Sequence, residues 1–164
     1  MTATPREERI ARALAWIAGR LRDLDVPFQV AGGLAALAHG AERELNDIDL
    51  YVAEGALALL RDELGEHHAH GPRRHRGDQW DCWFMEVRFA GEEIELAEAA
   101  RTRYRKDPEH PWHDARVDFD EPAHREVFGV RVPVMPRERL VAYKRRLDRP
   151  VDRQDVRALR GRRR

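Results

Sequence analysis

The stretch that decides the fold runs from Val30 to Val52 and reads VAGGLAALAHGAERELNDIDLYV. It predicts a buried strand that runs into a double glycine, then a short apolar helix, and then a second strand that carries Asp47 and Asp49. Because strand side chains alternate between the two faces, both aspartates point the same way while Ile48 and Leu50 enter the core. Two carboxylates therefore share one solvent-facing surface.

These two carboxylates predict a binding site for a cation. Like charges at this spacing repel, so the pair either has a raised pKa or binds a positive ion. Mg²⁺ suits the pair because it takes one or two protein carboxylates and completes its shell with water and substrate phosphates. Gly32 and Gly33 let backbone N–H groups approach an anion closely at the start of a helix. The stretch therefore predicts a phosphate-binding turn that faces a metal site.

Length and charge limit the class of protein. At 164 residues the chain is long enough for one domain with a substantial core. We expect that single domain to span 1–164, with its core at about 5–135 and a helical C-terminal segment at about 136–160. The 30 basic and 30 acidic residues cancel, so no overall field draws the protein onto nucleic acid or a membrane. We interpret the basic stretch 157–164 as a solvated tail in preference to a nucleic-acid contact.

Cysteine content and hydropathy indicate a cytoplasmic protein. Cys82 is the single cysteine, which excludes an internal disulfide and fits a reducing compartment. The sequence begins without an apolar run long enough for a signal peptide or a membrane span. We therefore expect a cytoplasmic protein with no membrane partner.

Two helices and a polar segment surround the deciding stretch. Thr4 and Glu7 have the spacing of a capping box, and apolar residues recur at helical intervals over 5–24. A second helix is expected at 54–64. The segment 66–78 is rich in histidine and has no clear periodicity. Because no cysteine pair accompanies those histidines, a mobile polar loop is favoured over a zinc cluster.

A predicted hairpin over 83–96 supplies a third acid. Its second arm contains Ile94-Glu95-Leu96, which places the Glu95 carboxylate opposite the core face. Glu93 lies on the same face, so alternation alone does not choose between the two glutamates. The other elements are expected as strands at 28–31 and 127–134, helices at 34–39, 136–147 and 152–159, and an irregular segment at 104–124.

In combination, these features resemble the polymerase beta-like nucleotidyltransferase superfamily, and specifically its small bacterial members. Gly32 and Gly33, followed by Asp47 and Asp49, match the glycine pair and the paired-acid motif of that superfamily. Glu95 matches its third carboxylate. The resemblance implies an α/β (α+β) fold in which a mixed sheet is flanked by helices, with short C-terminal helices.

The end of the chain is similar to the recurrent ending of the same superfamily. There, a helix that carries a lysine precedes an Arg-x-x-Asp-x-x-Asp stretch, as 135–144 with Lys144 precedes 149–155 here. The chain departs from the pattern at Leu45 and Asn46, because relatives usually carry a small hydroxyl residue two positions before the first aspartate. This departure leaves the acids themselves unchanged, and the loss of a hydroxyl is expected to loosen the turn or to alter contacts with the nucleotide.

The resemblance implies an enzyme that uses Mg²⁺ (or Mn²⁺) to move a nucleoside monophosphate from a nucleoside triphosphate such as ATP to a hydroxyl group. Asp47 and Asp49 would hold the metal against the triphosphate, and Glu95 would share a second metal or act as a general base. Arg43 and Lys144 are candidates to bind phosphate oxygens, and each is equally well explained as an ion-pair partner.

The resemblance leaves the acceptor and some alternatives open. The acceptor classes are an antibiotic-like small molecule, an RNA or a protein, bound by segments 66–78 and 104–124 or across a homodimer. A non-catalytic nucleotide- or partner-binding module, such as a toxin–antitoxin component, is the main alternative, and a metal-dependent phosphohydrolase is a weaker one. For Trp80, Trp83 and Trp112, core packing is preferred over stacking on a base or an aromatic acceptor.

Overall fold

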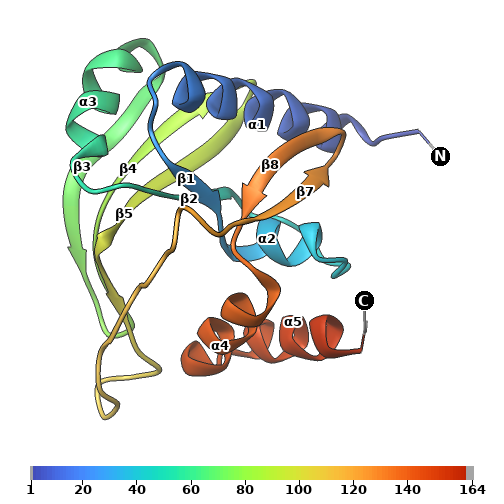
Figure 1. Cartoon of the computed structure of the whole chain (residues 1–164), viewed down its shortest axis with the longest axis vertical. Helices are drawn as coiled ribbons and strands as arrows, with labels where there is room; N and C mark the ends of the chain where they lie inside the picture. Colours follow the sequence, from blue (N-terminus) through green and yellow to red (C-terminus); the bar gives the residue numbers. More distant parts are fainter. Residues whose placement is uncertain (1, 162–164) are drawn as a thin grey trace.

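A mixed eight-stranded sheet, with helices on both sides, forms the frame of the computed structural model (Figure 1), which describes residues 2–161. The first half of the chain forms α1 (Pro5–Asp23), β1 (Phe28–Val30), α2 (Gly32–Ala38), β2 (Ile48–Val52), α3 (Ala56–Glu63) and the 3₁₀ turn η1 (Gly65–His67). The strands that follow are β3 (His68–Arg76), β4 (Trp80–Phe89), β5 (Glu92–Tyr104), β6 (His113–Asp114), β7 (Ala123–Val127) and β8 (Val130–Val134). Two helices, α4 (Arg137–Leu147) and α5 (Pro150–Arg160), end the described part.

The strand order of the sheet brings distant parts of the sequence together. Along the sheet the order is β3-β4-β5-β2-β1-β8-β7, and β6 pairs with β5 off this path. β2 runs antiparallel to β1 and parallel to β5. In the parallel pair, Asp49 lies directly opposite Glu95 and Ile48 lies opposite Ile94. Register therefore places the predicted third acid beside the predicted aspartate strand.

Alternation along β2 and β5 separates the core from the site. Ile48, Leu50, Ile94 and Leu96 are almost fully buried and belong to the same apolar cluster as the inner face of α1. The predicted capping box at the start of α1 is confirmed, because the Thr4 side chain accepts from the Glu7 backbone and the Glu7 side chain accepts from the Thr4 backbone. α1 thus covers one side of the sheet, while α4 and α5 lie on the other side (Figure 1).

The prediction of a mobile loop at 66–78 is wrong. Most of this segment forms η1 and then β3, the edge strand next to β4, where His75 pairs with Cys82. Its side chains are mainly exposed or half-buried, so no apolar alternation marks the strand in the sequence. Backbone pairing with β4 orders the segment instead.

The single strand predicted at 127–134 is two strands. β7 and β8 form a hairpin that turns at Phe128 and Gly129, both of which have positive φ (49° and 81°). The predicted hairpin at 83–96 is longer than expected, because β4 starts at Trp80 and β5 reaches Tyr104. Within the described residues, no helix has both the length and the apolar composition that crossing a membrane requires. The last three residues of the basic stretch 157–164 lie outside the described part.

Candidate active site

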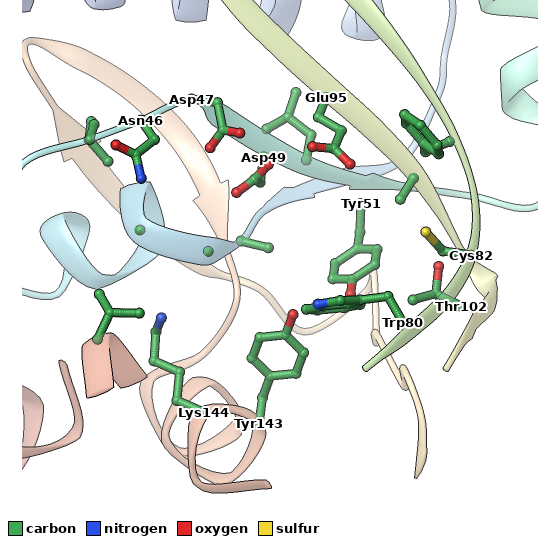
Figure 2. Close-up of a pocket in the computed structure, with 18 of the residues that line it drawn as sticks. Asn46, Asp47, Asp49, Tyr51, Trp80, Cys82, Glu95, Thr102, Tyr143 and Lys144 are labelled. Carbon is green, nitrogen blue, oxygen red and sulfur yellow. The ribbon is translucent and has the colours of Figure 1, made fainter. Parts of the chain in front are cut away.

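A pocket of about 610 Å³ lies at the meeting point of the sheet and the C-terminal helices (Figure 2). Asp49 of β2 and Glu95 of β5 line it, whereas their buried neighbours Ile48 and Ile94 do not. Leu45 and Asn46, where the sequence departs from the superfamily pattern, also line it. All seven of the site residues expected from the sequence line this one pocket: Gly32, Gly33, Arg43, Asp47, Asp49, Glu95 and Lys144.

Three carboxylates converge in the pocket. Asp47 lies one residue before β2, Asp49 lies within β2, and Glu95 lies opposite Asp49 on β5. One oxygen from each carboxylate lies within 4.8 Å of the others. Among residues 2–161, which include the histidines of 66–78, no other group of three or more histidine, cysteine, aspartate or glutamate side chains has this arrangement.

The three carboxylates bear their negative charges at a high electrostatic cost. Burial raises the pKa of Asp49 well above its usual value, and the charges of Asp47 and Glu95 raise it further. Burial likewise raises the pKa of Glu95 to about 7, with the Asp47 charge acting in the same direction. A hard divalent cation would relieve this repulsion, and an all-oxygen donor set suits Mg²⁺ or Mn²⁺. The residues present therefore fit the implied metal.

The sheet register distinguishes Glu95 from Glu93, which alternation left equivalent. Glu93 has a side chain that is 51% exposed and pairs with Arg88, whose Nη2 lies 3.1 Å from its Oε1. Glu95 instead lies opposite Asp49 and points toward the aspartates (Figure 2). Glu95 is therefore the glutamate that joins the acid group.

The double glycine allows two side chains to approach the backbone closely. Gly32 has a φ of +61°, and a Cβ added there would lie 2.5 Å from Oδ2 of Asp49. A Cβ added at Gly33 would lie 2.9 Å from the Cζ atom of Arg43. Any larger residue at either position would displace one acid or one guanidinium group of the pocket.

Lys144 and Arg43 combine both of the roles considered for them, since they line the pocket and also form ion pairs. Nζ of Lys144 lies 2.8 Å from Oδ2 of Asp155, and Nη1 of Arg43 donates to the same oxygen at 2.6 Å. Arg149, which sequence reasoning did not single out, lines the pocket as well and donates to both oxygens of Asp152. The sequence feature that could have identified Arg149 is its position at the start of the Arg-x-x-Asp-x-x-Asp stretch.

The far end of the pocket is aromatic, and sequence reasoning missed it. Tyr51, Trp80 and Tyr143 lie there, near Cys82 and Thr102 (Figure 2). Tyr51 follows Asp49 by two residues on the same strand, so alternation could have placed it on the acid face. No local pattern places Trp80 or Tyr143 in the pocket, because only the folded chain brings β4 and α4 to β2. Core packing had been expected for Trp80.

Comparison with known proteins identifies the fold. No protein-family description and no curated protein matches the sequence. Among solved structures, a nucleotidyltransferase candidate from Thermotoga maritima is 23% identical, with a TM-score of 0.68 over 98% of this chain and 97% of that chain. The chain has the nucleotidyltransferase fold. The fold expected from the resemblance is thereby confirmed.

Two further structures share this nucleotidyltransferase fold at low sequence identity. The lincosamide antibiotic adenylyltransferase LnuA, with lincomycin bound, is 15% identical, with a TM-score of 0.58 over 98% of this chain and 99% of that chain. ANT(2'')-Ia, in complex with adenylyl-2''-tobramycin, is 16% identical, with a TM-score of 0.59 over 92% of this chain and 87% of that chain. Both matches span most of this chain, including the sheet.

Proposed function

We propose that the protein is a Mg²⁺- or Mn²⁺-dependent nucleotidyltransferase that moves a nucleoside monophosphate from a nucleoside triphosphate to a hydroxyl group of a small molecule. The convergence of Asp47, Asp49 and Glu95 beside Gly32 in one pocket is the observation that carries the proposal. The two antibiotic-related structures of the same fold support the small-molecule acceptor, because one is a lincosamide adenylyltransferase and the other contains an adenylylated tobramycin.

In this proposal the three acids have different tasks. Asp47 and Asp49 would hold the cation, which would supply positive charge to neutralise the α-phosphoryl group. Glu95 would complete the ligand set or, in the alternative role, take the proton of the acceptor hydroxyl. The acceptor oxygen forms a bond to the α-phosphorus, the bond between that phosphorus and the bridging oxygen breaks, and pyrophosphate leaves.

The cationic end of the pocket would bind the leaving pyrophosphate. Arg43, Lys144 and Arg149 line the pocket and are linked through the ion pairs of Asp152 and Asp155. Because charge-assisted hydrogen bonds to phosphate are among the strongest in proteins, three cations at one end favour the β- and γ-phosphates there. The α-phosphorus would then lie beside the acids.

The aromatic end of the pocket would bind the acceptor. Tyr51, Trp80 and Tyr143 offer ring faces and hydroxyl groups beside Cys82 and Thr102 (Figure 2). Such a surface suits an uncharged or cationic molecule with rings, and it lacks the cations that an RNA backbone requires. A volume of about 610 Å³ is within the usual range for a small-molecule site.

An activity assay tests this proposal. The protein is incubated with each nucleoside triphosphate and Mg²⁺, alone and with a lincosamide, an aminoglycoside, RNA or a protein extract, and pyrophosphate and acceptor mass are measured. We expect pyrophosphate release and the mass gain of a nucleoside monophosphate on a small molecule, both lost in Asp49→Asn and kept in Asp81→Asn. Nucleotide binding without release would indicate a binding module, and free phosphate or monophosphate without a modified acceptor would indicate a phosphohydrolase.

A further inference from the structure

Two buried carboxylates lie behind the cations of the pocket. Asp152 and Asp155, both on α5, have residue exposures of 0% and 1%, and neither lines the pocket. Oδ2 of Asp155 lies 2.6 Å from Nη1 of Arg43 and 2.8 Å from Nζ of Lys144. One carboxylate therefore joins α5 to α4 and to the segment between α2 and β2.

Asp152 extends this arrangement to a third cation. Its Oδ2 accepts from Nε of Arg149 at 2.7 Å, its Oδ1 accepts from Nη2 at 3.1 Å, and Lys144 lies 3.7 Å from Oδ1. Three cations thus share two anions, which leaves a net positive charge facing the pocket. Because the anions lie behind the cations, they do not occupy the space where phosphate oxygens would enter.

Flexible cations bind an anion better when their direction is set in advance. A lysine or arginine side chain loses conformational entropy when it is ordered, and a partner that orders it before binding removes that loss from the binding step. Lys144 is buried to 2% exposure, so its ammonium group has no freedom to search for another partner. The guanidinium group of Arg43 lies close to the backbone at Gly33. The charge of Lys144 partly offsets the rise in the pKa of Asp49 that burial and the other two acids cause.

We propose that Asp155 is a positioning residue, which sets the direction of Arg43 and Lys144 so that both face the triphosphate. The proposal rests on the proposed function, because it assumes that this end of the pocket binds phosphate. It assigns to α5 a task in substrate binding, although Asp155 itself contacts no substrate.

The chain supplies a matched control for the loss of a buried carboxylate. Asp81 has a side chain that is 8% exposed and binds two arginines, Arg74 at 2.8 and 2.9 Å and Arg103 at 2.9 Å. None of these three residues lines the pocket. Asp81→Asn therefore removes a similar ion-pair centre without changing the proposed phosphate site.

Binding of inorganic tripolyphosphate tests the proposal without requiring a known nucleotide or acceptor. Affinity is measured by titration calorimetry with Mg²⁺ present, using wild type, Asp155→Asn and Asp81→Asn, with circular dichroism to check that each is folded. We expect Asp155→Asn to bind tripolyphosphate about tenfold or more weakly, since two charge-assisted hydrogen bonds lose their geometry. Asp81→Asn should bind within about twofold of wild type, because its arginines lie outside the site.

Each other outcome is decisive. Equal affinity in wild type and Asp155→Asn overturns the positioning role and leaves the proposed function intact. A wild-type protein that binds no tripolyphosphate overturns both, because the phosphate site itself is then absent. If Asp155→Asn does not fold, Arg43→Lys takes its place: it keeps the charge but loses the guanidinium group that Asp155 directs. Unchanged affinity in Arg43→Lys then overturns the positioning role.

Discussion

Replacing Gly32 with alanine should disable the metal site while leaving most of the fold intact. The new Cβ would lie 2.5 Å from Oδ2 of Asp49, whereas ordinary van der Waals contact begins at 3.4 Å. Asp49 would have to move by about 1 Å, and a displacement of that size in a reacting centre lowers the rate by about 10²-fold. The φ of +61° adds a backbone penalty of about 1–2 kcal/mol for any residue with a Cβ.

Gly55→Ala is the matched control for this backbone penalty. Gly55 also has a positive φ, +83°, but a Cβ added there meets nothing within 4 Å. We therefore expect Gly55→Ala to lose about 1–2 kcal/mol of unfolding free energy in urea, and Gly32→Ala to lose at least as much because of its clash with Asp49. Only Gly32→Ala should lose Mn²⁺ affinity in a titration and, with an acceptor identified, about 10²-fold in transfer rate.

Two outcomes with the glycine variants would contradict a role for the turn at Gly32 in metal binding. If Gly32→Ala binds Mn²⁺ as tightly as Gly55→Ala does, the close approach of Asp49 to the turn has no part in metal binding. If Gly55→Ala loses Mn²⁺ affinity as well, the effect comes from general destabilisation and not from the position of Asp49.

Three further predictions address other parts of the pocket. The pKa of Glu95 is about 7 in the folded protein and 4.5 ordinarily, so between these two pH values the metal-free folded protein binds more protons than the unfolded chain. The unfolding free energy of the metal-free protein should therefore fall as pH rises from 5 to 8. Urea unfolding with saturating Mg²⁺ should show a smaller fall, and a rise with pH in metal-free buffer would contradict the burial of Glu95. Burial raises the pKa of Cys82 to about 11, so a thiol reagent at pH 8 should label it slowly until the protein is unfolded, and fast labelling of the folded protein would contradict this. Trp80→Ala should raise the KM for the acceptor about tenfold and leave tripolyphosphate affinity unchanged; an unchanged KM would remove Trp80 from the acceptor site.

Local patterns were sufficient for the centre of the fold. Alternation placed Asp47 and Asp49 on one face, and the glycine pair marked a tight turn, because both features depend on neighbouring residues alone. Helical spacing and the capping box likewise predicted α1 almost to its ends. These parts required no knowledge of the remaining chain.

Features that depend on tertiary contacts could not be predicted. The choice between Glu93 and Glu95 required the register of β5 against β2, which no local pattern encodes. β3 appeared to be a loop because an edge strand with polar side chains on both faces has no apolar alternation. The ion pair of Asp155 with Arg43 joins residues 112 positions apart, and no local pattern in the sequence pairs the two.

The hairpin of β7 and β8 shows how turn chemistry can be misread. The sequence of 127–134 was taken as one strand interrupted by Gly129. Phe128 and Gly129 both adopt positive φ, and together they reverse the chain. Two-residue hairpin turns usually have glycine, asparagine or aspartate at positions with positive φ. Phenylalanine is uncommon there, so the pair Phe128-Gly129 did not indicate a hairpin turn in the sequence.

A crystal grown with Mn²⁺ and a non-hydrolysable nucleoside triphosphate would show, through the anomalous scattering of manganese, whether the three acids form a metal site. We expect a manganese peak bound by Asp47, Asp49 and Glu95, with the β- and γ-phosphates directed toward Arg43 and Lys144. A peak at any other place, or a triphosphate bound away from the three acids, would contradict this expectation.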